Sequence, residues 1–138
     1  MQGPGQGAMT AAERAPVVMP AVRALAMPAD TNPSGDIFGG WLLAQMDVAG
    51  GIVAYERAEG RVATVAVDGM TFHHPVYVGD VVSCYAEVAS TGRTSMTLQV
   101  EVWVQRARTG EPIKVTEGRF TYVAIGADGR KRPLPERP

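Results

Sequence analysis

Apolar and polar residues alternate along much of this chain, which is the pattern of strands that bury one face and expose the other. The segment 94–104 shows the pattern most clearly, because Met96, Leu98 and Val100 alternate with polar residues. Residues 81–89 alternate in the same way, and the STGRT sequence between the two segments suits a tight turn. The pattern therefore predicts an antiparallel hairpin.

Three further segments favour strands. Residues 115–125 follow the hairpin after a turn, and residues 61–72 are rich in Val and Thr, which favour sheets. Residues 15–27 predict another strand that Pro20 interrupts. Because proline cannot donate to a strand ladder, this strand should lie at an edge or begin only at Ala21.

One long segment, residues 41–58, breaks the alternation and is apolar on nearly every side. A helix that is hydrophobic all round is normally buried. The Gly50-Gly51 pair costs roughly 1 kcal/mol of helix propensity per glycine but permits close approach to a sheet. Gly39-Gly40 precedes the segment. We therefore expect an α+β fold, in which an antiparallel sheet wraps around one long central α-helix.

Composition narrows the classes of protein. The chain has 138 residues, 46% hydrophobic and 20% charged, with a formal net charge of −1. These values predict one globular domain, and without a basic excess nucleic acid is not expected as a partner. No apolar run reaches the length of a membrane-spanning helix, so no membrane is expected either. The lone cysteine, Cys84, cannot form an internal disulfide, which favours a reducing cytoplasm.

The two ends of the chain differ from its middle. Residues 1–16 are rich in Pro, Gly and Gln and lack the features of a signal peptide, so we expect a disordered segment. Residues 128–138 form a basic, Pro-rich tail that also looks unfolded. The folded domain should therefore span 17–127.

Asp47 is the first candidate for chemistry. It lies in the middle of the apolar helix, and its helical neighbours three and four residues away include no cation. A carboxylate is costly to bury, and buried acids often serve as general bases or nucleophiles. The alternative is that Asp47 faces solvent or is satisfied by nearby backbone.

The loop before the helix is the second candidate. Asp30 and Asn32 imitate the start of a calcium loop, but Trp41 stands where the bidentate glutamate is required, so calcium is rejected. The start of the helix at Gly39 and Gly40 instead offers backbone N–H groups to an anion or a developing oxyanion. The alternative is a flexible turn.

The remaining candidates are weaker. His73 and His74 are adjacent on an extended chain, so they point to opposite faces and cannot share one metal; no metal is expected. Cys84 lies on an apolar strand face and is better interpreted as a small core residue. Arg93, in the STGRT turn, could contact a phosphate, although a solvated arginine is commoner there.

Together these residues resemble the hotdog-fold acyl-CoA thioesterases, of the short bacterial type similar to YciA. The similarity covers about 17–135, almost the whole folded body. It is carried by RALAMPADTNPSGDIFGGWLLAQMD (23–47), GRVATVAVDGMTFHHPVYVGDVV (60–82), STGRTS (90–95) and EVWV (101–104).

The resemblance implies a function and an assembly. Two subunits would pair their sheet edges, and the dimers would gather into a hexamer, with a site at the dimer interface. Asp47 would be the general base or nucleophile, and Asn32 would position water or the acyl carbonyl. Backbone N–H groups near Gly39 and Gly40 would stabilise the oxyanion. The substrate would be an acyl-CoA thioester, hydrolysed to acid and coenzyme A without a cofactor.

The resemblance also implies a coenzyme A site at Arg93, Thr94 and Ser95. Relatives often carry a basic residue where this chain has His74, so a phosphate contact there is not carried over. Two other functions stay open. An acyl-thioester hydratase or dehydratase of the same fold would need His73 or His74 with an acidic partner. A non-enzymatic module would bind acyl-CoA without turnover.

Overall fold

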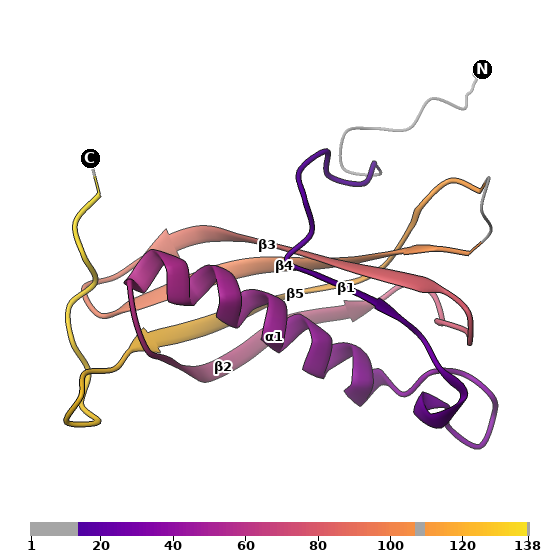
Figure 1. Cartoon of the computed structure of the whole chain (residues 1–138), viewed down its shortest axis with the longest axis horizontal. Coiled ribbons are helices and arrows are strands. Elements are labelled where there is room, and N and C mark those ends of the chain that lie inside the picture. The colour runs from indigo at the N-terminus through magenta and orange to yellow at the C-terminus, as the bar shows by residue number, and fades with distance from the viewer. Residues whose placement is uncertain (1–13, 107–109, 138) are drawn as a thin grey trace.

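One long helix lies across one face of an antiparallel sheet (Figure 1). The computed structural model describes residues 14–106 and 110–137. Within these ranges, the elements are β1 (Val22–Leu25), the short 3₁₀ helix η2 (Pro28–Asp30), α1 (Gly39–Ala58), β2 (Val62–Phe72), β3 (Val81–Thr91), β4 (Ser95–Gln105) and β5 (Ile113–Ala124). The predicted α+β arrangement is confirmed, and each predicted strand and the helix are present.

The strands follow the order β1-β3-β4-β5-β2, and every neighbouring pair is antiparallel. The predicted hairpin is the β3–β4 pair, in which Cys84 lies opposite Val102. β1 has four residues and begins after Pro20, as the proline predicts. β2 forms the opposite edge with eleven residues. A long edge strand leaves backbone groups available for pairing with another chain.

The core lies between the sheet and one side of α1. Alternate residues of β4 point into it, because successive side chains of a strand face opposite ways. The β4 and α1 side chains in this core are Met96, Leu98, Val100, Val102, Val104, Leu42, Met46, Ala49, Ala54 and Ala58. A Cβ added to Gly50 would overlap the hydroxyl of Tyr122 on β5. The close approach predicted from the glycine pair is therefore confirmed at Gly50.

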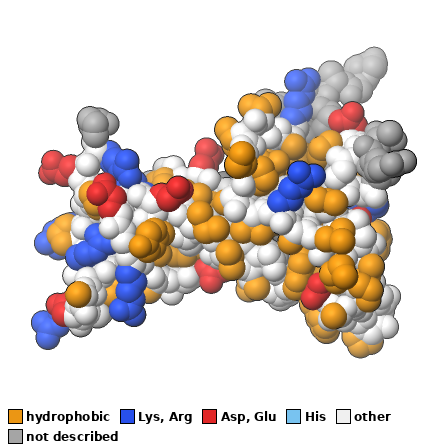
Figure 2. All heavy atoms as spheres, in the orientation of Figure 1, with side chains coloured by type: hydrophobic (Ala, Val, Ile, Leu, Met, Phe, Trp, Pro, Cys, Tyr) orange, Lys and Arg blue, Asp and Glu red, His pale blue; other side chains and the backbone are white. Residues whose placement is uncertain are grey.

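The expectation that α1 is buried on all sides is wrong for a single subunit. Several of its apolar side chains face outward, among them Val48 and Tyr55 with 54% and 58% of their surface exposed. The sheet covers one side of a helix only, so the other apolar side has no cover within the described residues. Figure 2 shows hydrophobic side chains spread over this face of the molecule.

The C-terminal tail also differs from the expectation, because residues 128–137 do not project as an unfolded segment. The N–H of Leu134 donates to the carbonyl of Arg93 at 2.9 Å, and the Leu134 side chain packs against the core. Arg57 Nη1 donates to the carbonyl of Pro135 at 2.8 Å. Backbone pairing and one apolar anchor therefore hold the tail along the end of α1. The predicted N-terminal segment lies almost entirely outside the described residues.

No helix in the described ranges has the length and apolar character needed to cross a membrane.

Candidate active site

The Asp47 carboxylate sits half-buried on α1 and is held by two hydroxyl groups from the sheet. Its Oδ1 accepts a hydrogen bond from Thr64 Oγ1 at 2.8 Å and another from the Tyr122 hydroxyl at 2.9 Å. Tyr122 also lies 2.9 Å from the backbone carbonyl oxygen of Asp47. Among the described residues, no cation pairs with Asp47. The carboxylate is therefore oriented without a salt bridge.

The register of the sheet places these two donors together. Thr64 on β2 lies directly opposite Tyr122 on β5, so both side chains face α1. Gly50 is the position on α1 that leaves room for the phenol ring. Sequence reasoning missed Thr64 and Tyr122, because their partnership with Asp47 depends on pairing between distant strands. The glycine pair was the one local signal of a close contact.

The Tyr122 hydroxyl remains a hydrogen-bond donor across a wide pH range. Burial, followed by the hydrogen bond to Asp47, raises the pKa of the Tyr122 hydroxyl far above its ordinary value. The hydroxyl therefore stays protonated and can only donate to the carboxylate. Within the described residues, Asp47 Oδ2 has no protein hydrogen-bond donor. This second oxygen is the one available to a water molecule or a substrate.

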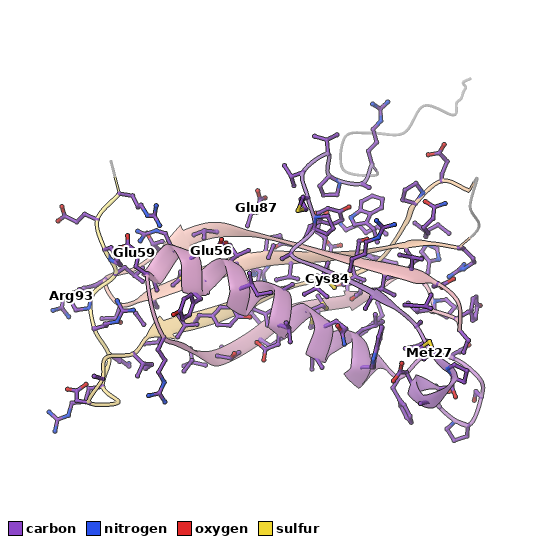
Figure 3. All side chains as sticks on the ribbon, viewed as in Figure 1. Met27, Glu56, Glu59, Cys84, Glu87 and Arg93 are labelled. Carbon is purple, nitrogen blue, oxygen red and sulfur yellow. The ribbon has the colours of Figure 1, made fainter. Side chains whose placement is uncertain are left out.

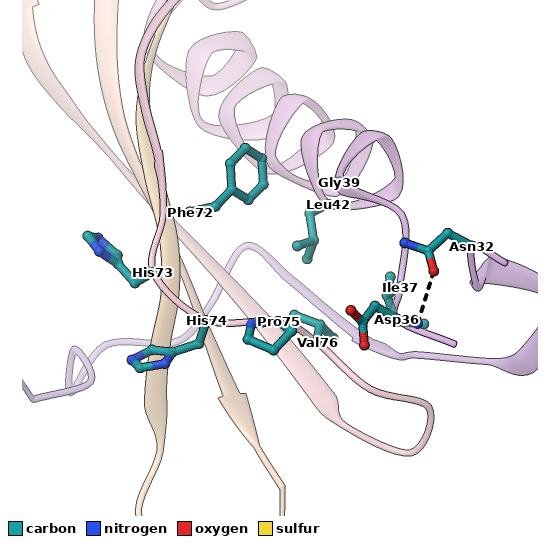
Figure 4. A pocket seen from close by; sticks show the side chains of 10 residues that line it. All are labelled: Asn32, Asp36, Ile37, Gly39, Leu42, Phe72, His73, His74, Pro75 and Val76. Carbon is teal, nitrogen blue, oxygen red and sulfur yellow. Dashed lines mark hydrogen bonds between the residues drawn. The ribbon is translucent and has the colours of Figure 1, made fainter. Parts of the chain in front are cut away.

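A separate pocket of about 300 Å³ lies where the loop after η2 meets the end of β2 (Figure 4). Asn32, Gly39, Leu42 and Phe72 line it. The side-chain oxygen of Asn32 accepts hydrogen bonds from the backbone N–H groups of Ser34 at 2.9 Å and of Asp36 at 3.1 Å. The oxygen thus closes the turn, and the amide nitrogen remains as the group that can donate to a ligand.

The start of α1 supplies further donors at the pocket. Phe38 is the N-cap residue, and its side chain makes no capping hydrogen bond. In the described part of the chain, the N–H groups of Gly39 and Gly40 have no acceptor. A Cβ on Gly39 would lie 3.6 Å from the ring of Phe72, so the first turn of α1 adjoins the end of β2. An uncapped helix start of this kind favours negative charge.

One subunit keeps Asp47 and the pocket apart. Asp47 does not line the pocket. It follows Gly39 by eight residues on α1, which corresponds to about 12 Å along the helix axis. Asn32 and Gly39 are thus brought together, whereas Asp47 stands two turns away with its own hydrogen-bond partners.

Comparisons with known proteins decide the family. Residues 34–111 match the thioesterase superfamily. The chain is 53% identical, over 130 residues, to the acyl-CoA thioester hydrolase YciA of Salmonella typhimurium, covering 92% of this chain and 98% of that protein. The chain belongs to the thioesterase superfamily. The hotdog fold expected from the resemblance is confirmed.

Two solved structures of hexameric thioesterases resemble this one closely. The hexameric thioesterase y2039 from Yersinia pestis has a TM-score of 0.83 and 54% identity, with 89% of this chain and 100% of that chain covered. A hexameric broad-specificity acyl-coenzyme A thioesterase has a TM-score of 0.82 and 48% identity, covering 86% of this chain and 88% of that one. The latter structure is of a variant in which alanine replaces an aspartate.

In this thioesterase-superfamily member, the turn between β3 and β4 is far from the pocket. The N–H of Gly92 donates to the carbonyl of Ser95 at 2.8 Å, and Ala124 N–H donates to the carbonyl of Thr94 at 2.9 Å. Arg93 projects into solvent at the end of the molecule where α1 ends (Figure 3). The structure thus places the predicted coenzyme A residues at the opposite end of α1 from the pocket.

Both histidines line the pocket, and His73 has an acidic partner. The ring of His73 turns away from Phe72 (Figure 4) and pairs with Glu117 Oε2 at 2.8 Å. Glu117 also binds Lys114 at 2.9 Å, and hydrogen bonds from Lys114 and His73 lower its pKa. Glu117 is therefore an ionised partner in a charged cluster rather than an acid facing the pocket.

Cys84 is a core residue, as its apolar strand face predicts. It is fully buried, and desolvation raises the pKa of its thiol to about 12. Because the thiolate is the nucleophilic form, Cys84 is inert at neutral pH.

Proposed function

We propose that this protein is an acyl-CoA thioester hydrolase in which Asp47 activates water or attacks the thioester carbonyl itself. The observation that carries the proposal is the Asp47 carboxylate, anchored through Oδ1 by Thr64 and Tyr122 while Oδ2 has no protein donor in the described ranges. The similarity to YciA supports the choice of substrate. Because Thr64 and Tyr122 hold Oδ1, the Oδ2 oxygen would be positioned toward water or the thioester carbonyl carbon.

The reaction needs a proton acceptor and a site for negative charge. If Asp47 acts as a base, it takes a proton from water while the water oxygen bonds to the thioester carbonyl carbon. The carbon–sulfur bond then breaks, and the coenzyme A thiolate takes up the proton. If Asp47 is the nucleophile, its carboxylate displaces the coenzyme A thiolate from the acyl carbon to form an acyl-aspartate anhydride. Water then hydrolyses the anhydride to the free acid and the Asp47 carboxylate, and the proton released is taken up by the thiolate. Both routes pass through a tetrahedral oxyanion.

The pocket provides donors for that oxyanion. Among residues 14–106 and 110–137, the N–H groups of Gly39 and Gly40 lack acceptors, and the Asn32 amide nitrogen remains available once its oxygen has closed the turn. Preorganised donors of this kind stabilise charge that develops in the transition state. Asn32 would then hold the acyl carbonyl, and the apolar wall at Leu42 and Phe72 would receive the acyl chain.

A second subunit would bring the two halves together. Thr64, which holds Asp47, and Phe72, which adjoins Gly39, lie four residues on either side of Asp68 in β2. If two β2 edges pair antiparallel about a two-fold axis near Asp68, Thr64 of one subunit lies opposite Phe72 of the partner subunit. Asp47 would then face the pocket of the partner, and each dimer would hold two composite sites.

The surface of one subunit supports such a dimer. The outer side of α1 and the β2 edge carry apolar side chains that are at least 37% exposed: Leu43, Val48, Ile52, Tyr55, Val65, Val67 and Phe72. An apolar surface beside a long unpaired strand is typical of a subunit interface. Because both similar structures are hexamers, we propose a hexamer of three such dimers.

The basic end of the molecule suits the phosphates of coenzyme A. The docked tail brings Arg130, Lys131 and Arg132 to the same end as Arg93, where Figure 2 shows blue side chains gathered. The pantetheine arm of coenzyme A separates the thioester from the phosphates, so one ligand would reach both Asp47 and this end. Arg93, Thr94 and Ser95 are the proposed contacts.

A location in the cytoplasm fits the same proposal. The single thiol, Cys84, is buried and free, as expected in a reducing compartment.

A screen of thiol release from acetyl-CoA to palmitoyl-CoA tests this function. We expect free coenzyme A to appear with at least one chain length, and an enoyl-CoA included as a further substrate should show no loss of enoyl absorbance. Loss of enoyl absorbance without thiol release would instead show a hydratase. Tight binding of acyl-CoAs without turnover would show a binding module, and either result would overturn the proposal.

A further inference from the structure

We infer that Tyr122 is a positioning residue for the reaction, which fixes the Asp47 carboxylate so that only Oδ2 faces the substrate. The inference rests on the proposed catalytic role of Asp47. It adds a residue on β5, far from Asp47 in sequence, to the machinery, and it assigns a reason for glycine at position 50.

The geometry ties the carboxylate to its own backbone. The Tyr122 hydroxyl lies 2.9 Å from Asp47 Oδ1 and 2.9 Å from the Asp47 carbonyl oxygen. One hydroxyl proton shared between these two acceptors restrains the side-chain torsions of Asp47 relative to α1. The ring itself is 1% exposed, so packing fixes the donor in turn.

Gly50 makes this arrangement possible. A Cβ at that position would overlap the Tyr122 hydroxyl, and it would lie only 3.0 Å from Cζ of the ring. Any side chain at position 50 would therefore push the phenol away from Asp47. The helix therefore has a glycine near its centre, at the position where the phenol lies against it, although glycine has a low helix propensity.

The groups that face Asp47 make Tyr122 the titratable partner to test. From β2 the contact is Thr64, which does not titrate, and from β5 it is Tyr122. On α1 itself, the residues one turn away are Leu43, Ala44, Gly50 and Gly51, which carry no charge. Burial and the bond to Asp47 keep the phenol protonated, so Tyr122 donates to the carboxylate whenever the carboxylate is ionised.

The experiment compares Tyr122→Phe with Tyr85→Phe, since Tyr85 lies half-buried on β3, among residues on the other face of the sheet. Tyr122→Phe removes one hydrogen bond to a charged group, so kcat should fall roughly 10–100-fold while KM changes less than about twofold. Tyr85→Phe should change neither of these quantities.

Gly50→Ala provides an independent route to the same loss. It should lower kcat by a similar factor, and adding Tyr122→Phe to it should lower kcat little further, because both changes remove one contact. Thermal unfolding measured alongside shows that each variant is folded.

Two results separate the inference from the proposed function. If Asp47→Asn retains activity, the catalytic role of Asp47 fails and the inference fails with it. If Asp47→Asn is inactive while folded Tyr122→Phe keeps the wild-type kcat, the function stands and the role of Tyr122 is overturned.

Discussion

The surroundings of Asp47 and the pocket at Asn32 lie along the same helix, yet different interactions hold them in place. At Asp47, side chains from two paired strands donate hydrogen bonds to the carboxylate, and the absence of a side chain at Gly50 leaves room for the Tyr122 phenol. At the pocket, the Asn32 side chain closes a turn of the backbone, and α1 begins without a side-chain cap, so backbone N–H groups line this half of the site. Each half is organised on its own, which is what a site shared between two subunits requires.

The difference also supports the proposed chemistry. The side-chain half offers an acceptor, since Asp47 Oδ2 has no protein donor in the described ranges. The backbone half offers donors, since the N–H groups of Gly39 and Gly40 have no acceptors there. Hydrolysis of a thioester needs both, an acceptor for the proton of water and donors for the oxyanion.

Removing the acceptor should have the largest effect. Asp47→Asn keeps an oxygen for Thr64 and Tyr122 but loses the base, so kcat should fall roughly 10²–10⁴-fold with KM little changed. The free energy of unfolding should hold or rise, because a half-buried charge without a cation is replaced by a neutral group. Thiol-release kinetics and thermal unfolding measure both. A folded variant near the wild-type rate would remove Asp47 from the mechanism.

Two substitutions at Asn32 distinguish its structural role in closing the turn from its proposed role as an oxyanion donor. Asn32→Asp keeps the oxygen that accepts from Ser34, whereas Asn32→Ala removes it. If the amide N–H is an oxyanion donor, both variants should lose roughly 10²-fold in kcat, less than Asp47→Asn in a direct comparison. Normal turnover by Asn32→Asp would reduce Asn32 to a turn residue.

A charge on the exposed side of α1 should separate the subunits. Ile52→Glu places a carboxylate in the proposed interface and should raise the dissociation constant roughly 10–100-fold, with activity lost in parallel at low concentration. Ile52→Val keeps the surface apolar and should behave as wild type. Sedimentation across a dilution series measures both. An active monomer of Ile52→Glu would contradict a shared site.

The smallest effect should come from the basic end. Arg93→Ala should raise KM about threefold at low salt and weaken the dependence of KM on salt, because the charge is exposed and screened. Arg23→Ala, exposed on β1, is the matched control and should leave KM unchanged. Steady-state kinetics at two salt concentrations decide the matter. If Arg93→Ala changes neither quantity, Arg93 does not contact coenzyme A.

The local parts of the fold could be predicted from the sequence. Alternation in 94–104 and 81–89 specified a hairpin, because a strand with one buried face has a period of two residues. Pro20 predicted the late start of β1 for the same kind of local reason. Asp47 could be recognised because a single carboxylate is unusual within an apolar helix. Gly39 could be recognised because it belongs to a glycine pair at the start of that helix.

Non-local contacts could not be predicted in this way. The Thr64–Tyr122 pair meets Asp47 only through the register of β2 on β5. The outer side of α1 looked like core because hydrophobicity does not tell a partner subunit from a sheet. The tail looked unfolded because its attachment uses single backbone bonds and the side chain of Leu134, none of which has a periodic pattern.

The most direct test of the shared site mixes two subunits that are each impaired by a different substitution. Asp47→Asn and Asn32→Ala proteins, each carrying a different tag, are co-expressed, and the mixed oligomer is purified through both tags. In a mixed dimer with composite sites, one site contains both substitutions and the other contains neither, so each mixed dimer within the hexamer should regain about half of the activity of a wild-type dimer. Activity no higher than the sum of the two parent proteins would contradict a site built from two subunits.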